Sequence, residues 1–199
     1  MAEPKPMSLR DRRRLETREL LVAAAIDSFS VKGFHATSID DITDQAGTSR
    51  ATFYAYFDTK DAVLAAVVER MWVEVEDIYA QFGALTDWSA SSIGAWLTRF
   101  VRAWQMTAAR NRVAAEASSA ELAKDLPDRY RQLVKIVRSQ HQLWAHFTDR
   151  EADARASMLV LLLQEVLTHH FFEDPEADAD LMVQYLTSAA RDLLRAQRT

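Results

Sequence analysis

Apolar residues recur at helical spacing along nearly the whole chain, and very few helix-breaking residues interrupt them. The 199 residues include only 4 Gly and 4 Pro, and 49% of the residues are hydrophobic. Long helices tolerate this composition, whereas a β-sandwich needs many turns built on Gly and Pro. The sequence therefore predicts an all-α protein of about nine helices with a sizeable apolar core.

The periodicity gives approximate bounds for these helices. We expect the first over residues 10–32, two short helices within 37–60, and a fourth that ends at Gly83. The fifth carries an apolar stripe from Ile93 to Trp104, and a break near 110–112 leads to a short helix around 113–122. The last three are expected from Pro127 to Trp144, over 151–172 and over 176–196.

Residues 37–60 carry the clearest local signals of the chain. Thr37 or Ser38 can cap one short helix, and Thr48 or Ser49 can cap the next. Gly47 lies between them and suits the left-handed conformation that ends a helix. This pattern predicts a helix-turn-helix, a motif whose second helix enters the DNA major groove.

The second short helix has two distinct faces. Phe53 and Phe57 are four residues apart, so we expect them to bury one face against the rest of the domain. The opposite face carries side chains that can contact bases or phosphates, namely Arg50, Thr52, Tyr54 and Tyr56. The two tyrosines could instead pack in the core, but the two phenylalanines already supply the inward face.

The first third of the chain resembles the tetracycline-repressor (TetR) family of bacterial transcriptional regulators. The residues that carry the resemblance are Arg12 to Arg14, Thr17, Arg18, Ala24, Ala25, Phe29, Gly33, Phe34, Thr37 to Ile39, Ile42, Ala46, Gly47, Ser49 to Phe57 and Lys60. Two positions depart from the family pattern, because Thr43 stands where Ala is usual and Thr48 where Val is usual. The resemblance implies a three-helix DNA-binding unit followed by a larger helical body that binds ligands and dimerises.

The candidate DNA-binding residues have individual roles. Arg50 is the best candidate for a bidentate contact with guanine, and Ala51 and Thr52 suit a thymine methyl group. Lys60 is expected near the phosphate backbone, and the hydroxyl groups suit phosphate oxygens. The full set is Ser38, Thr48, Ser49, Arg50, Ala51, Thr52, Tyr54, Tyr56 and Lys60.

The charge of the chain is unevenly distributed. The net charge is −5, yet residues 1–60 carry equal numbers of acidic and basic side chains. In agreement with this split, the resemblance implies a DNA-binding domain over residues 1–60, with a disordered arm at 1–8, and a ligand-binding and dimerisation domain over 61–199. An acidic body would be repelled by DNA and leave only the N-terminal part to dock, although so small a difference in counts can also arise by chance.

Aromatic residues are concentrated in the predicted fourth, fifth and seventh helices. They can line an apolar pocket for a small hydrophobic ligand, or simply fill a core. The resemblance favours the pocket, because similar regulators bind inducers between these helices. The candidate ligand-binding residues are Trp72, Trp96, Phe100, Trp104, Met106, Tyr130, Trp144 and Phe147.

The last two predicted helices carry more apolar surface than one body can easily bury. Together with the resemblance, this predicts a homodimer through Met158, Leu161, Leu162, Tyr185, Ala189 and Leu193. The alternative is an ordinary monomer core. A symmetric dimer requires a palindromic double-stranded DNA operator with half-sites about one helical turn apart.

Two alternative functions require features that the sequence lacks. A helical enzyme with a di-iron-like site needs paired Glu-x-x-His motifs, but Glu165 and His169 are four residues apart and no second pair has the right spacing. An architectural DNA binder would need a far more basic chain. We therefore expect no enzyme, no catalytic residue, no metal and no cofactor.

The cellular setting is also predicted from composition. The chain has no Cys, which suits a reducing compartment. No apolar run approaches the ~20 residues that span a bilayer, and the start lacks the apolar core of a signal peptide. A cytoplasmic protein with no membrane partner is therefore expected.

Overall fold

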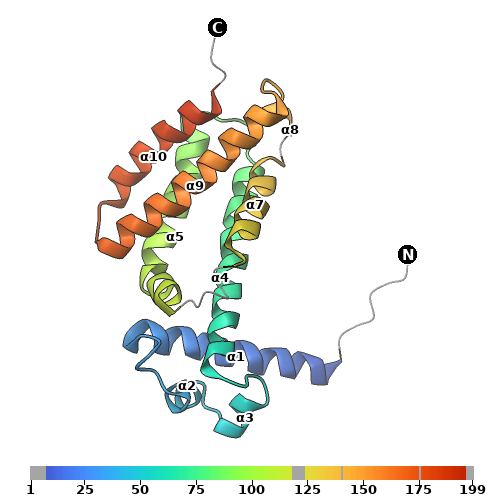
Figure 1. Ribbon diagram of the computed structural model, residues 1–199, viewed down its shortest axis with the longest axis vertical. Coiled ribbons are helices and arrows are strands. Elements are labelled where there is room, and N and C mark those ends of the chain that lie inside the picture. The colour runs from blue at the N-terminus through green and yellow to red at the C-terminus, as the bar shows by residue number, and fades with distance from the viewer. Residues whose placement is uncertain (1–7, 118–123, 140, 175, 196–199) are drawn as a thin grey trace. The chain divides into compact units, whose positions relative to one another are not determined.

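A computed structural model describes residues 8–117, 124–139, 141–174 and 176–195. Within these ranges it contains nine helices and no strand (Figure 1), so the predicted all-α class is confirmed. None of the described helices combines the length and the apolarity needed to cross a membrane. The predicted arm at 1–8 lies almost entirely outside the described residues.

Contacts divide the chain into two compact units, and the division falls inside one helix. Helix α4 (Lys60–Gly83) passes from the first unit to the second after Arg70. The first unit also includes Val113–Ala117, and the second unit holds the remainder. The expected functional division at residue 60 stays a proposal, because units defined by contacts need not coincide with functional domains.

The first unit is built from α1 (Leu9–Lys32), α2 (Ile39–Gln45), α3 (Arg50–Tyr54) and the start of α4. Helix α1 ends at Gly33, whose φ of 79° lies in the region that glycine tolerates best. The Phe29 and Phe34 rings then meet edge to face with centroids 5.3 Å apart. This contact closes the turn that leads from α1 to α2.

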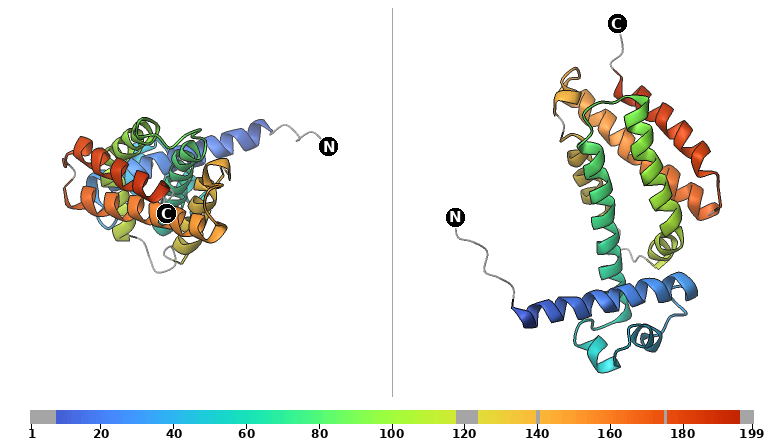
Figure 2. Two further views of the ribbon diagram at one scale, coloured as in Figure 1. Left: turned by 90° about the horizontal axis from the view of Figure 1, so that it is seen from above. Right: turned by 180° about the vertical axis from the view of Figure 1, so that it is seen from behind.

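The second unit contains α5 (Ala90–Ala117) up to Arg112, α7 (Leu126–Val137), α8 (His141–Trp144), α9 (Asp149–Glu173) and α10 (Ala179–Leu194). Helix α9 packs against both α7 and α10, and α9 and α10 lie side by side (Figures 1 and 2). The core between the helices is aromatic: Trp96 stacks on Phe100 at 5.0 Å, and Tyr79 meets both rings edge to face. The apolar stripes predicted for these helices therefore form one packed core.

The predicted break near 110–112 is wrong, because α5 continues without interruption to Ala117. Three consecutive polar residues suggested a loop, but none of them is a helix breaker. Asn111 instead donates through Nδ2 to the Thr107 hydroxyl one turn earlier, at 3.1 Å. The short helix expected around 113–122 falls partly within α5 and partly outside the described residues.

The predicted helix start with Pro127 in its first turn is confirmed, but the expected continuation of that helix to Trp144 is wrong, since α7 ends at Val137 and α8 is separate. The chain turns at Arg138 and Ser139, whose N–H groups donate to the carbonyls of Val134 and Ile136. The Trp144 indole N–H then donates to the Val137 carbonyl at 3.2 Å. A buried tryptophan thus satisfies a helix-terminal carbonyl that a continuing helix would have bonded itself.

Candidate nucleic-acid interface

Helix α2 is fixed at its start by a capping box. Ser38 Oγ accepts a hydrogen bond from the Asp41 N–H at 3.1 Å, and Asp41 Oδ2 accepts one from the Ser38 N–H at 2.8 Å. Lys32, at the end of α1, pairs with the same carboxylate at 2.5 Å. The hydrogen bonds from Lys32 and then from Ser38 hold the pKa of Asp41 well below its usual range. Of the two expected caps, Ser38 is therefore the one used.

The turn after α2 requires glycine and accommodates both of the unusual threonines. Gly47 has a φ of 62°, and the Thr48 N–H donates to the Thr43 carbonyl at 2.9 Å. Thr43 is buried, and its hydroxyl donates to the Asp40 carbonyl. The Thr48 hydroxyl is buried without a hydrogen-bond partner in the structure. A valine-like role in packing therefore describes Thr48 here better than a phosphate contact does.

Helix α3 is only five residues long and is anchored at both ends. Ser49 caps it by accepting a hydrogen bond from the Thr52 N–H at 3.1 Å, and the two hydroxyls lie 3.0 Å apart. Phe53 and Phe57 are buried, as predicted, with ring centroids 5.8 Å apart. The outer face of the helix is left to Arg50, Ala51 and Tyr54, all of which are exposed.

Arg50 lies in an ion pair that joins α3 to α2. Its Nη1 is 3.0 Å from both carboxylate oxygens of Asp40, and the two side chains remain 57% and 59% exposed. The guanidinium carbon lies 6.0 Å from the centre of the Tyr54 ring. A hydrogen bond with Tyr54 and then the contact with Asp40 raise the pKa of Arg50 above its ordinary value. The group is therefore held in a definite position on the surface.

Lys60 is directed into the first unit. Its Nζ donates to the carbonyls of Phe34 at 2.6 Å, Thr37 at 2.8 Å and His35 at 3.4 Å. The ammonium also lies 4.4 Å from the centre of the Phe34 ring. A lysine has three N–H donors, so these carbonyls occupy all of them. The arrangement does not favour the expected phosphate contact.

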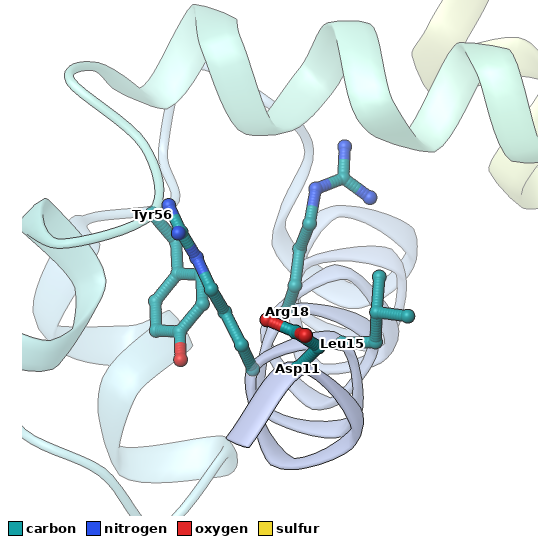
Figure 3. A pocket seen from close by; sticks show the side chains of 5 residues that line it. Asp11, Leu15, Arg18 and Tyr56 are labelled. Atoms are coloured by element: carbon teal, nitrogen blue, oxygen red, sulfur yellow. The ribbon is translucent and has the colours of Figure 1, made fainter. Parts of the chain in front are cut away.

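Tyr56 lies outside α3 and faces α1. Together with Asp11, Arg14, Leu15 and Arg18 it lines a surface hollow. Figure 3 shows the tyrosine ring across the hollow from the three labelled side chains of α1. Two arginines and a phenolic hydroxyl, which are groups that can contact phosphates, share this hollow with the carboxylate of Asp11. The sequence indicated the arginines and the tyrosine, but not that α1 and the segment after α3 share a surface.

The candidate ligand-binding residues fall into separate groups in the second unit. Trp96 and Phe100 are fully buried in the core, whereas Met106 is 81% exposed. Trp72 meets Tyr130 at 6.1 Å, and Trp144 meets Phe147 at 6.0 Å. Trp104 is buried in the same core. The structure thus brings the aromatic residues together in pairs and leaves Met106 apart from them.

The half-buried members of this set have polar partners. The Tyr130 hydroxyl donates to Glu165 at 3.1 Å, and burial, followed by the charge of Glu165, raises the pKa of Tyr130 to about 12. Arg129 lies 5.3 Å from the Trp72 ring. The edge of the aromatic core near Trp72 is therefore amphipathic.

The candidate dimer residues divide by exposure. Met158, Leu161 and Tyr185 are 55%, 46% and 66% exposed, while Leu162, Ala189 and Leu193 are half-buried. Leu181, at 47% exposure, adds to the outer apolar surface of α10. Such large exposed apolar side chains on neighbouring helices can form an interaction surface.

The residues considered for a metal site have other partners. Glu165 accepts from Tyr130, and His169 Nε2 lies 3.4 Å from Glu173. Among the described residues, no three His, Asp or Glu side chains are grouped so as to hold a metal ion.

Comparison with known proteins agrees with this geometry. Residues 21–67 match the family model described as bacterial regulatory proteins, tetR family. The chain is 39% identical over 54 residues to the uncharacterized HTH-type transcriptional regulator YdgC of Bacillus subtilis. That match covers 27% of this chain and only 28% of the relative's length, so the chain matches less than a third of that protein.

Solved structures extend the likeness to the whole fold. The fatty acid degradation regulator FadR of Bacillus halodurans has a TM-score of 0.70 at 18% identity, covering 98% of this chain and 99% of its own. FadR of Bacillus subtilis, solved in complex with stearoyl-CoA, has a TM-score of 0.68 at 13% identity, covering 86% and 96%. The chain therefore shares the fold of these regulators, and its capped helix pair, α2 and α3, forms a helix-turn-helix. The sequence likeness to the tetR family is carried by residues 21–67 of this chain.

Proposed function

We propose that this protein is a transcriptional regulator that reads double-stranded DNA through α3, in the cytoplasm. The observation that carries the proposal is the division of α3 into a buried face, Phe53, and an exposed face that presents Arg50, Ala51 and Tyr54. An inward aromatic anchor fixes the helix, so its outer side chains can meet base edges in a defined register. The cap at Ser49 adds to this rigidity.

The remaining contacts in this proposal are made to phosphates. Arg14, Arg18 and Tyr56 line the hollow beside α1, where the two arginines outnumber the single carboxylate of Asp11 and the tyrosine supplies a hydroxyl donor. Phosphate contacts of this kind fix the orientation of a protein on the duplex without selecting a sequence. Lys60 is left out of this group, because its donors already bond the carbonyls described above.

We also propose that two copies bind one operator. The exposed apolar side chains of α9 and α10 (Met158, Leu161 and Tyr185) support a homodimer through these helices. A two-fold dimer presents two recognition helices, so the operator is an imperfect palindrome with half-sites ~34–36 Å apart or a multiple of that spacing.

The ligand in this proposal is a small hydrophobic molecule whose binding releases the operator, which makes the protein a repressor. In one conformation of the dimer the two recognition helices are spaced so that they do not fit the two half-sites. A ligand that binds this conformation more tightly raises its population and so lowers the fraction of protein bound to DNA. The aromatic core with its amphipathic edge at Trp72 and Tyr130 supports an apolar ligand with a polar end. The FadR structure with stearoyl-CoA makes long-chain acyl-CoA the first compounds to test.

The decisive experiment is selection of duplexes from a random DNA pool by the full chain, followed by gel-shift titration at moderate salt. The proposal expects a preferred, imperfectly palindromic sequence. Arg50→Ala should weaken binding to it by ~1–3 kcal/mol and relax the preference for one guanine. Arg99→Ala, which removes an exposed charge from α5, is the matched control and should leave base preference unchanged. If no preferred sequence is recovered, the proposed function is wrong.

A further inference from the structure

Asp40 bonds the guanidinium of Arg50 in a way that bears on base recognition. Both of its oxygens lie 3.0 Å from Nη1, so Nε and Nη2 remain outside the ion pair. The guanidinium is planar and its five N–H donors form a rigid fork. Fixing one nitrogen of the group therefore restricts the plane of the group and the direction of the other two.

The contact is not explained by the needs of α2. Ser38 and Asp41 already make both hydrogen bonds of the capping box, so the helix does not need the Asp40 carboxylate as a cap. Exposed ion pairs contribute little to folding stability. The Asp40 carboxylate is thus well placed to act on Arg50. Apart from that contact, it contributes to the fold only through the favourable interaction of a negative charge with the first turn of α2.

Tyr54 borders the same group from a second direction. Its ring centre lies 6.0 Å from the Arg50 guanidinium carbon, and it projects from α3 one turn after Arg50. Arg50 is therefore contacted from two helices, by a carboxylate of α2 and by an aromatic ring of α3. Such support lowers the side-chain entropy that an arginine loses when it binds.

We propose that Asp40 is a specificity-determining residue that acts through Arg50, orienting the guanidinium so that Nε and Nη2 meet O6 and N7 of a guanine. This inference rests on the proposed DNA-binding function. Asp40 has a second effect in the same direction, since its exposed negative charge opposes binding to any phosphate backbone. The oriented Nε and Nη2 donors of Arg50 strengthen binding to the specific DNA sequence, and the negative charge of Asp40 weakens binding to non-specific DNA. Both effects raise the ratio of specific to non-specific affinity.

The test uses the full chain, the duplex selected from the random pool, and a second duplex of equal length with the guanine read by Arg50 replaced by adenine. Asp40→Ala should lower the ratio of affinities for the two duplexes about 10-fold, because one bidentate contact accounts for ~1–3 kcal/mol of discrimination. Binding to the second duplex should tighten, since a negative charge has been removed.

Two controls isolate the effect. Asp44→Ala removes an exposed carboxylate from the same helix and should tighten binding to both duplexes equally, leaving the ratio unchanged. In an Arg50→Ala background, Asp40→Ala should behave like Asp44→Ala, because the group that it positions is gone. Asp40→Asn, which keeps the shape and one acceptor oxygen, should give an intermediate ratio and serves if the alanine variant unfolds.

Several results would overturn the inference. If Asp40→Ala tightens binding to both duplexes with an unchanged ratio, Asp40 merely competes with DNA for Arg50. If it lowers the ratio equally with and without Arg50, it does not act through that residue. Failure to recover any preferred duplex instead refutes the proposed function itself, and this inference with it.

Discussion

Lys60 provides the sharpest structural prediction of the first unit, because one side chain bonds three backbone carbonyls of the segment between α1 and α2. We expect Lys60→Ala to destabilise the protein strongly. Two of the hydrogen bonds are short, at 2.6 Å to Phe34 and 2.8 Å to Thr37, and the third, to His35, is 3.4 Å long. The substitution leaves those carbonyls without this donor, and half-buried carbonyls are costly to leave unpaired.

The magnitude follows from these contacts. Each of the two short hydrogen bonds contributes about 1 kcal/mol net, and the cation–π contact with Phe34 at 4.4 Å adds about 0.5–1 kcal/mol. We therefore expect a loss of about 2–3 kcal/mol in the free energy of unfolding of the first unit. Lys32→Ala is the matched control, because Lys32 makes one exposed ion pair with Asp41 and should cost no more than about 1 kcal/mol.

Urea denaturation followed by circular dichroism measures both variants, and the salt dependence of DNA binding separates the two possible roles of Lys60. An internal lysine leaves the slope of log affinity against log salt unchanged, whereas a lost phosphate contact lowers its magnitude by about 0.9. The internal role would be refuted if Lys60→Ala were as stable as the Lys32→Ala control and if its log affinity depended less steeply on log salt than that of the wild type. That result would support a contact between Lys60 and a phosphate instead.

Three further predictions concern other parts of the chain. A Cβ at Gly83 would clash with the Ile136 carbonyl oxygen, so Gly83→Ala should lower the free energy of unfolding, measured by thermal denaturation, by about 1–3 kcal/mol. Gly94→Ala is the control: its Cβ would lie 3.5 Å from the nearest atom, so the substitution should be neutral or stabilising. Asp41→Asn should be less stable than wild type at pH 7, and the difference should shrink as the pH falls below about 4, because a carboxylate with a lowered pKa stabilises the fold only while it is ionised. Equal stability of the two proteins at pH 7 would contradict this assignment. Tyr185→Asp should convert the proposed dimer to monomers in light scattering, and an unchanged mass would place the interface elsewhere.

The helix-turn-helix could be predicted from sequence because its signals are local. Ser38 and Ser49 cap helices through hydrogen bonds to residues three positions further on, and Gly47 needs only its own backbone conformation. Phe53 and Phe57 follow helical spacing, which is visible in any sequence. Each of these features depends on fewer than six consecutive residues, so pattern reasoning was sufficient.

The contacts that define the site were not predictable in the same way. Arg50 meets Asp40 across 10 residues, and Lys60 meets the Phe34 carbonyl across 26. Tyr56 and Arg18 line one hollow only because α1 and the segment after α3 border it (Figure 3). A lysine or tyrosine at these positions suits a phosphate equally well on sequence grounds, and only the tertiary arrangement distinguishes the two roles.

The recognition helix itself explains why its surroundings are so heavily bonded. Five residues cannot form a stable helix alone, since isolated helices shorter than ~12–15 residues are marginal in water. The conformation of α3 must therefore come from Ser49, from the buried Phe53 and Phe57, and from the turn at Gly47. The outward side chains contribute little to folding. Substitutions on that face should alter the sequence that is read and leave the free energy of unfolding within about 0.5 kcal/mol of wild type, whereas substitutions of the anchoring residues should lower both stability and DNA affinity together.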